Sequence, residues 1–211
     1  MILHTVNARR SLSSTTGTPY CQKTMGALLN ASREGVCLAY PLVRHAFESI
    51  LPPLEDRLAR SQLFGKAVRL VFHDAGEIDM QSHQDDDTMG PDGCLSDTSA
   101  NSGLLEDSSI VMTVLEPIWQ TVCDQISRAD FWVLFAKLIL AEASANQLSI
   151  EYQYGRRDAP DCIAGGGRLP SGQAGLNEIN QVFVTQMGLT MVDAGQTVAC
   201  CSIVYLTTSC L

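Results

Sequence analysis

The stretch Val68-Arg69-Leu70-Val71-Phe72-His73-Asp74-Ala75-Gly76 carries much of the information in this 211-residue chain. It closes an apolar pattern of helical spacing that begins near residue 54. Arg69 and His73 are four residues apart, so a helix places them on one face, one turn apart. The imidazole can take a proton from one oxygen and return it to another, while the guanidinium stabilises negative charge. Phe72 predicts an apolar wall beside the same space.

An arginine and a histidine at this spacing also have a plainer explanation. In a generic helical protein, His73 would be a core histidine bonded to the backbone and Arg69 a surface residue. The two explanations differ in what a His73→Ala substitution would change. The first predicts a steep loss of reactivity, and the second predicts an effect on stability alone.

Helical patterns continue on both sides of this stretch. Apolar spacing predicts helices over 39–50, 54–75, 104–122 and 175–187, and a buried central helix that begins at 127 and ends at 145. Ser127 with Asp130, and Thr190 with Asp193, predict capping boxes, and Gly188 suits the position after a helix end. Long loops are expected over 76–101 and 152–172. The fold class is therefore predicted to be mainly α.

Composition excludes several classes of function. Hydrophobic residues make up 45% and charged residues 18%, which is typical of a globular protein. The net charge of −9 argues against a nucleic-acid partner. No apolar run reaches the ~18–20 residues of a membrane helix, so no membrane partner is expected. The oligomeric state is left open.

Eight cysteines point to disulfides and to an extracellular location. They are spread along the chain with no Cys-x-x-Cys pair, and no histidine lies near the later ones, which argues against a zinc site. The N-terminal residues do not have the pattern of a signal peptide. The pairing of the cysteines cannot be assigned from their spacing.

The central stretch resembles the distal motif of the plant, fungal and bacterial haem peroxidases, Arg-x-x-Phe-His-Asp-Ala-Gly. Further motifs follow in the family's order: Gly90-Pro91-Asp92-Gly93-Cys94, Asn101-Ser102-Gly103-Leu104, Leu115-Glu116-Pro117-Ile118, Ile126-Ser127-Arg128-Ala129-Asp130-Phe131, Gly155-Arg156-Arg157-Asp158, Arg168-Leu169-Pro170 and Met187-Gly188-Leu189-Thr190. The resemblance spans residues 39–194. It divides the chain into a poorly ordered lead-in over 1–38, a peroxidase-like distal domain over 39–194 and a divergent tail over 195–211.

The resemblance implies a haem b enzyme that reduces hydrogen peroxide and takes electrons one at a time from a small-molecule reductant. His73 corresponds to the distal acid–base and Arg69 to its electrostatic partner. Asn101 corresponds to the asparagine that accepts a hydrogen bond from that histidine, although it could also simply cap the following helix. Phe72 and Pro170 are expected at the haem, and for Pro170 an ordinary loop proline is an equal alternative.

The resemblance also implies a distal calcium site. Asp74 and Asp92 would supply carboxylates, and Gly90 would supply a backbone carbonyl. Cys94 stands where the family has a serine ligand, and a thiol is a poor ligand for calcium. The site is therefore expected to be incomplete, with Cys94 free to form a disulfide instead.

No haem axial ligand can be assigned, because every histidine precedes residue 84. A thiolate from Cys200 or Cys201 is conceivable, but nothing around them resembles a thiolate haem site. The chain is therefore expected to hold only the distal half of the fold and to be inactive or impaired as it stands. The alternative function is a non-catalytic, disulfide-rich, calcium-associated pseudoenzyme module.

Overall fold

The computed structural model describes residues 33–51, 56–80, 90–96, 100–159, 162, 168–171 and 175–195. Within these residues the regular elements are all helical, which confirms the mainly α fold class. Most of the predicted lead-in, most of the predicted tail, and the thiols Cys200 and Cys201 lie outside them. No described helix is both long and apolar enough to cross a bilayer.

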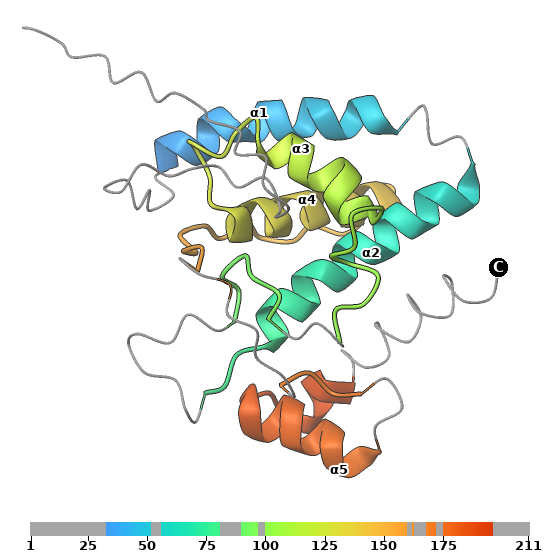
Figure 1. The fold of residues 1–211 in the computed structure, drawn as a ribbon, viewed down its shortest axis with the longest axis vertical. Helices are drawn as coiled ribbons and strands as arrows, with labels where there is room; N and C mark the ends of the chain where they lie inside the picture. The colour runs from blue at the N-terminus through green and yellow to red at the C-terminus, as the bar shows by residue number, and fades with distance from the viewer. Residues whose placement is uncertain are drawn as a thin grey trace, which may run out of the picture.

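The core is built by α1 (Arg33–Ile50), α2 (Arg57–Gly76) and α4 (Arg128–Ala143) (Figure 1). The helix α4 packs against both α1 and α2. Phe47 of α1 meets Phe135 of α4 edge to face, with ring centroids 5.5 Å apart. Leu63 and Leu70 of α2 are fully buried in the same cluster. This packing leaves the C-terminal part of α2 to project beyond the core.

The first helix begins at Arg33, six residues before the predicted start at residue 39. Pro41 lies inside this helix, where its missing N–H and its ring normally cost about 3 kcal/mol. Val36, Ala39, Val43 and Phe47 nevertheless form one continuous buried stripe across that position. Burial of this stripe outweighs the local preference, which is why the helix extends through the proline.

The predicted helix over 104–122 begins later than expected. Its helical part consists of η1 (Val111–Leu115), which has π-helical geometry, and α3 (Glu116–Trp119). The Ser109 hydroxyl accepts a hydrogen bond from the Met112 N–H at 3.2 Å and donates to the Leu104 carbonyl at 2.8 Å. This hydroxyl caps the segment, so residues 104–109 are turns instead of helix.

The predicted hydroxyl caps of the later helices are present, although the Asp130 carboxylate bonds residues 155 and 156 and does not close the predicted box. The Ser127 hydroxyl accepts from the Asp130 N–H at 3.1 Å and starts α4, and the Thr190 hydroxyl accepts from the Asp193 N–H at 3.1 Å. Gly188 has a φ of +71°, as expected of a residue that ends a helix. The predicted helix over 175–187 consists of α5 (Leu176–Ile179) and η2 (Asn180–Gln186), at the far end of α2 from α1 (Figure 1).

Candidate active site

Arg69 and His73 lie in the C-terminal half of α2. Asp56 caps this helix by accepting a hydrogen bond from the Leu58 N–H at 2.9 Å, which sets where the helix begins. Leu70, which lies between them in the same stretch of helix, is completely buried, so the rotation of the helix is fixed. The two polar side chains are consequently held on the half-buried face.

The guanidinium of Arg69 is fixed by three hydrogen bonds. Its Nε donates to Nε2 of His73 at 3.2 Å, and its two terminal nitrogens donate to the carbonyl oxygens of Ser102 at 2.9 Å and Ala100 at 2.8 Å. The predicted pair therefore converges, and a turn 31 to 33 residues further along the chain holds the arginine in place. Sequence reasoning did not foresee the two carbonyl contacts, since backbone acceptors leave no trace in residue type.

The tautomer of His73 follows from its second partner. Nδ1 of His73 lies 2.8 Å from Oδ1 of the buried Asn101, and an amide oxygen can only accept, so Nδ1 carries the proton. The lone pair is then on Nε2, where the Arg69 Nε–H donates. The amide group of Asn101 is oriented in turn, because its nitrogen donates to Glu77 at 3.3 Å. The structure brings together Arg69, His73 and Asn101, as the sequence predicts.

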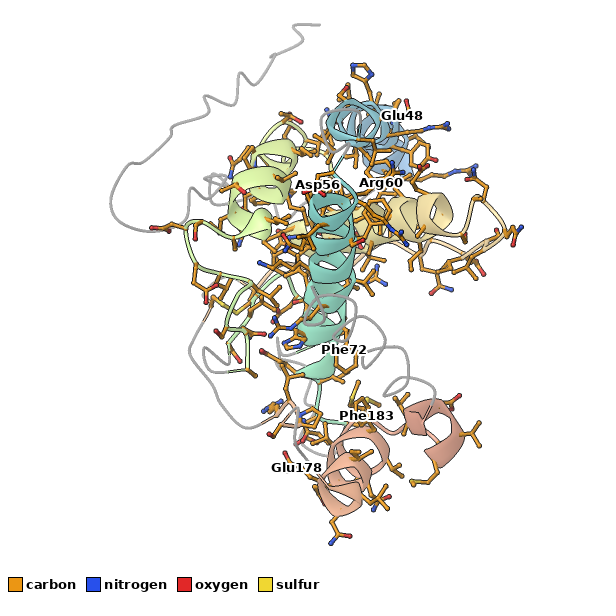
Figure 2. All side chains as sticks on the ribbon, turned by 90° about the vertical axis from the view of Figure 1, so that its right-hand side faces the viewer. Glu48, Asp56, Arg60, Phe72, Glu178 and Phe183 are labelled. Carbon is orange, nitrogen blue, oxygen red and sulfur yellow. A yellow bond between two sulfur atoms is a disulfide. The ribbon has the colours of Figure 1, made fainter. Side chains whose placement is uncertain are left out.

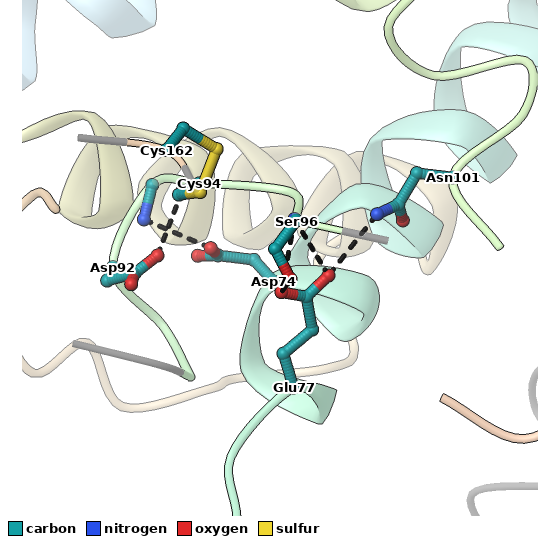
Figure 3. Close-up of a disulfide and its surroundings, with 8 residues drawn as sticks. Asp74, Glu77, Asp92, Cys94, Ser96, Asn101 and Cys162 are labelled. Carbon is teal, nitrogen blue, oxygen red and sulfur yellow. Dashed lines mark hydrogen bonds between the residues drawn. A yellow bond between two sulfur atoms is a disulfide. The ribbon is translucent and has the colours of Figure 1, made fainter. Parts of the chain in front are cut away.

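Glu77 extends this network into the buried loop (Figure 3). Its carboxylate accepts from the backbone N–H of Ser96 at 3.0 and 3.1 Å and from the Ser96 hydroxyl. Both residues are buried and neither was singled out from the sequence. The sequence did contain one signal for Glu77. A carboxylate directly after the C-terminal end of a helix is disfavoured by the helix dipole, so its presence there suggests a specific role.

Phe72 stands beside His73 and is itself backed by a second ring. The rings of Phe72 and His73 meet edge to face with centroids 5.9 Å apart. On its other side Phe72 stacks on Phe183 of η2 at 5.8 Å and an interplanar angle of 27° (Figure 2). The apolar wall predicted from Phe72 thus includes Phe183, which lies within the helix predicted over 175–187.

Pro170 belongs to a strip, Arg168–Ser171, that lies against the end of α2. Leu169 is buried next to Gly76, where an added Cβ would come within 2.7 Å of its Cδ2 atom. The Gln186 side chain donates to the Arg168 carbonyl at 3.0 Å, and the Arg168 guanidinium donates to the Glu77 carbonyl at 3.2 Å. These contacts place the half-buried Pro170 near the end of α2.

The predicted calcium carboxylates Asp74 and Asp92 lie close to each other (Figure 3), but their oxygens have other partners. Asp74 accepts from the Gly93 N–H at 3.0 Å, Asp92 accepts from the Cys94 N–H at 2.9 Å, and the Gly90 carbonyl accepts from the Asp92 N–H at 2.8 Å. Cys94 forms a disulfide with Cys162 and supplies no ligand. Among the described residues, no three acidic, histidine or cysteine side chains are arranged to hold a metal ion.

Burial dominates the electrostatics of these two carboxyl groups. It raises the pKa of Asp74 well above its usual value, and the neighbouring Asp92 raises that pKa further. Burial also raises the pKa of Asp92 to about 7, against the opposing effect of the Cys94 N–H. Two carboxyl groups in this environment favour a shared proton or a bound cation.

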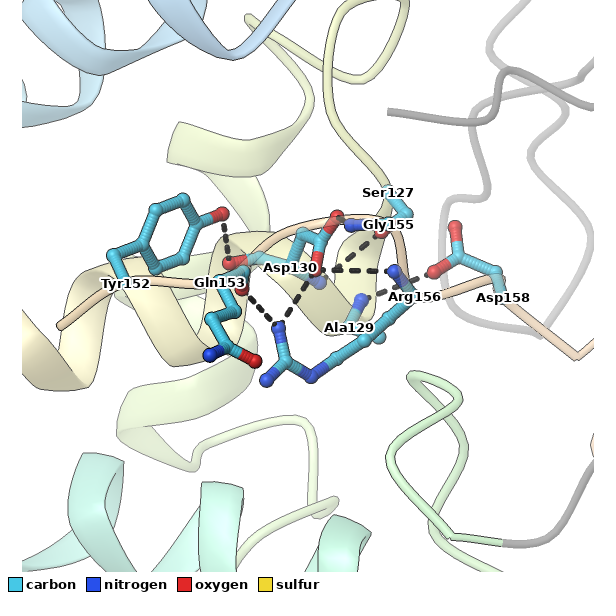
Figure 4. A network of polar contacts seen from close by, with 8 residues as sticks. All are labelled: Ser127, Ala129, Asp130, Tyr152, Gln153, Gly155, Arg156 and Asp158. Carbon is cyan, nitrogen blue, oxygen red and sulfur yellow. Dashed lines mark hydrogen bonds and ion pairs between the residues drawn. The ribbon is translucent and has the colours of Figure 1, made fainter. Parts of the chain in front are cut away.

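The segment after α4 is tied to the start of that helix by Asp130 (Figure 4). The fully buried Asp130 carboxylate accepts from the Gly155 N–H at 2.7 Å and from the Arg156 guanidinium at 2.9 Å. Asp158 accepts from the Ala129 N–H at 3.0 Å, and the Ala159 N–H donates to the Asp92 carbonyl at 2.8 Å. Through these bonds α4 supports the loop that contains Asp92.

Comparison with known proteins identifies relatives. The peroxidase family model matches residues 43–199. L-ascorbate peroxidase 1, cytosolic, of Oryza sativa subsp. indica is 32% identical over 163 residues, covering 73% of this chain and 60% of that protein. L-ascorbate peroxidase 2, cytosolic, of Oryza sativa subsp. japonica is 33% identical over 131 residues, covering 60% of this chain and 47% of that protein. The chain therefore spans 60% or less of the length of these relatives.

These relatives correct the predicted location. The number of cysteines indicated an extracellular protein, whereas both rice proteins are named as cytosolic. The prediction was wrong because a cysteine count only correlates with the redox compartment and does not report it.

The match is extensive enough to place the chain. The family model covers most of the sequence, including α2 with Arg69 and His73, the turn that carries Asn101, and α4 with Asp130. The chain belongs to the peroxidase family.

Proposed function

We propose that this protein reduces hydrogen peroxide, with His73 as the group that moves the proton and Arg69 as its electrostatic partner. The observation that carries the proposal is the ordered set Arg69–His73–Asn101, in which Nδ1 of His73 is committed to Asn101 and the lone pair of Nε2 faces the guanidinium. A base oriented in this way is what removal of a peroxide proton requires.

The proton path begins at Nε2 of His73. A peroxide molecule that enters displaces the Arg69 Nε–H from this nitrogen and donates one of its own protons to it. His73 then returns that proton to the other oxygen, which leaves as water when the O–O bond breaks. The guanidinium remains charged throughout and stabilises the negative charge that develops on the leaving oxygen. Asn101 stabilises the transient imidazolium by holding its Nδ1–H.

Haem is the cofactor that this family implies, and the apolar wall of Phe72 and Phe183 beside His73 would suit part of it. When bound, haem would bind the peroxide and supply the two electrons that break the O–O bond. The imidazoles in the described residues are those of His45 and His73; His45 is exposed on α1 and His73 belongs to the polar network. We propose that Phe72 and Pro170 would line the haem beside His73, and no described residue is assigned to hold its iron.

The reductant and the location are proposed from the named relatives. Both rice proteins are L-ascorbate peroxidases and both are called cytosolic. We therefore propose ascorbate as the small-molecule reductant and the cytoplasm as the location. Comparison of ascorbate with a phenolic dye as the electron donor, at equal peroxide, tests the first of these proposals.

Calcium binding by Asp74, Gly90 and Asp92 stays a prediction. Its support is the pair of buried carboxyl groups with raised pKa values, since a cation would allow both to ionise. Against it stands the Cys94–Cys162 disulfide, which occupies the position of the expected side-chain ligand. Calcium should raise the unfolding temperature of the wild-type chain and leave that of Asp92→Asn unchanged if the site binds it.

The test of the proposed function compares two histidines. The chain is reconstituted with haemin and its peroxide-dependent oxidation of ascorbate is measured. His73→Ala should lower the rate on the order of 10²-fold, whereas His45→Ala, at an exposed position of α1, should retain it. Equal rates in the wild-type chain and in His73→Ala would refute the assignment of His73, and an inactive wild-type chain would favour the non-catalytic alternative.

A further inference from the structure

A single turn, Ala100–Gly103, holds both polar side chains of the site. The carbonyl oxygens of Ala100 and Ser102 accept hydrogen bonds from the Arg69 guanidinium, and the side chain of Asn101, between them, engages His73. The position of the guanidinium relative to the imidazole is therefore set by the backbone of this turn. Any group that fixes the turn also fixes the pair.

The turn is closed by a carboxylate that follows it. Oε1 of Glu106 accepts a hydrogen bond from the Gly103 N–H at 2.6 Å and lies 3.4 Å from the Ser102 hydroxyl, which donates to it. Gly103 has a φ of +82°, a conformation that glycine adopts freely, so the hydrogen bond to Glu106 restrains an intrinsically flexible position. The hydrogen bond from Gly103 lowers the pKa of Glu106, so the carboxylate is charged near neutral pH.

We propose that Glu106 is a positioning residue for Arg69 and His73, acting through the turn Ala100–Gly103. Glu106 is exposed on the surface, and its hydrogen bonds reach Gly103 and Ser102 of the turn. The inference rests on the proposed function, in which incoming peroxide takes over the contact between Arg69 and His73. At that moment the carbonyls of Ala100 and Ser102 keep the guanidinium in place, and Glu106 keeps those carbonyls in place.

A simple charge effect is the competing account. Glu106 also lies near Lys66, three residues before Arg69 on α2, and this lysine contributes to the lowered pKa of the carboxyl group. A carboxylate at this place could influence Arg69 through the electrostatic field without holding the turn. The two accounts make opposite predictions for substitutions at residue 106 that change either the charge of the side chain or its length, but not both.

The experiment measures exchange of the Arg69 Nε–H with water by ¹⁵N NMR in the full chain, without haem. The resonance is assigned by its loss in Arg69→Lys. Glu106→Asp keeps the charge but withdraws the carboxylate by one methylene, whereas Glu106→Gln keeps an acceptor at the same distance and removes the charge. Asp107→Asn removes an equal charge from the neighbouring exposed residue and serves as the matched control.

We expect faster exchange in Glu106→Asp and Glu106→Ala, by roughly three- to tenfold, as for the loss of one hydrogen bond. Glu106→Gln and Asp107→Asn should remain close to the wild-type chain. Faster exchange in Glu106→Gln, Glu106→Ala and Asp107→Asn, with Glu106→Asp close to the wild-type chain, would establish the charge effect instead. Wild-type exchange in all of the variants would show that Glu106 does not position the site. If Glu106→Ala fails to fold, the comparison of Glu106→Asp with Glu106→Gln still distinguishes the two accounts.

This result is independent of turnover. An inactive wild-type chain would defeat the proposed function and would leave the NMR comparison intact. Wild-type exchange in Glu106→Asp would defeat the positioning role and would leave the proposed function standing.

Discussion

Nδ1 of His73 and Oδ1 of Asn101 lie 2.8 Å apart, although 28 residues separate them in the sequence. This contact decides which nitrogen of the imidazole carries the proton, and so it decides whether Nε2 can act as a base. The histidine contributes the reactive atom, but the asparagine and the buried carboxylate behind it determine its state. The site is in this sense built by the loop as much as by α2.

Asn101→Ala should impair proton transfer more than it impairs folding. The substitution leaves the Nδ1–H of His73 without this acceptor, so the imidazole can adopt its other tautomer. We expect a decrease of about 10- to 100-fold in peroxide-dependent turnover. The ¹⁵N chemical shifts of the imidazole should show a mixture of tautomers. Asn177→Ala, at an exposed position of α5, is the control, and a single unchanged tautomer in Asn101→Ala would contradict the prediction.

Glu77→Gln should destabilise the fold by about 1–3 kcal/mol, as expected when a buried hydrogen-bond donor loses its acceptor. The carboxylate faces donors, namely the N–H and hydroxyl of Ser96 and the amide of Asn101. A glutamine brings a further NH₂ group among them. Urea unfolding measures the loss, with the exposed Glu151→Gln as the control. An unfolding free energy within 0.5 kcal/mol of the wild-type value, roughly the range of neutral surface substitutions, would mean that Glu77 is dispensable for stability.

The sequence predicted the parts of the site that obey helical rules. Arg69 and His73 share a face because a helix has a fixed period, and Ser127 and Gly188 mark helix ends through local hydrogen bonds and backbone conformation. Asn101 was located only through the resemblance to a family, since nothing in its own neighbourhood points to a residue 28 positions away.

Contacts between loops could not be predicted in this way. The Ser96–Glu77 hydrogen bonds and the Cys94–Cys162 disulfide join segments whose relative placement depends on the whole fold. The early start of α1 was missed for a related reason, because the benefit of burying Val36 depends on the tertiary core and opposes the local effect of Pro41. Local patterns in the sequence predict helices well, but they do not predict which residues the loops bring into contact.

Asp92 should make the stability of the chain depend on pH in calcium-free buffer. Its pKa is about 7 in the folded chain and about 3.9 in an unfolded one, so the folded state binds more protons between these values. The stabilisation is complete below pH ~4 and is lost as the pH rises through 7. The raised pKa of Asp74 acts in the same direction.

Asp92→Asn should remove part of this dependence. We expect the difference in unfolding free energy between pH 4.5 and pH 7.5 to shrink by about 1–2 kcal/mol, less than the full shift implies because solvent screens the group. Asp107→Asn, an exposed substitution of equal charge, should leave the profile of the wild-type chain unchanged. Identical profiles in the wild-type chain and in Asp92→Asn would show that Asp92 ionises freely in the folded state.

Gly103→Ala should weaken the turn that carries Asn101. With a φ of +82°, the backbone at this position favours glycine, and a side chain there costs about 1–2 kcal/mol. The added Cβ would lie 3.7 Å from a terminal nitrogen of Arg69, an ordinary contact, so the cost comes from the backbone and not from a collision. Asparagine tolerates this conformation better than alanine, so Gly103→Asn should recover part of the loss. Urea unfolding of both variants measures the effect. Gly175→Ala is the control, because nothing lies within 4 Å of the Cβ added there. Equal stability of Gly103→Ala and the wild-type chain would mean that the turn relaxes to a negative φ at no cost.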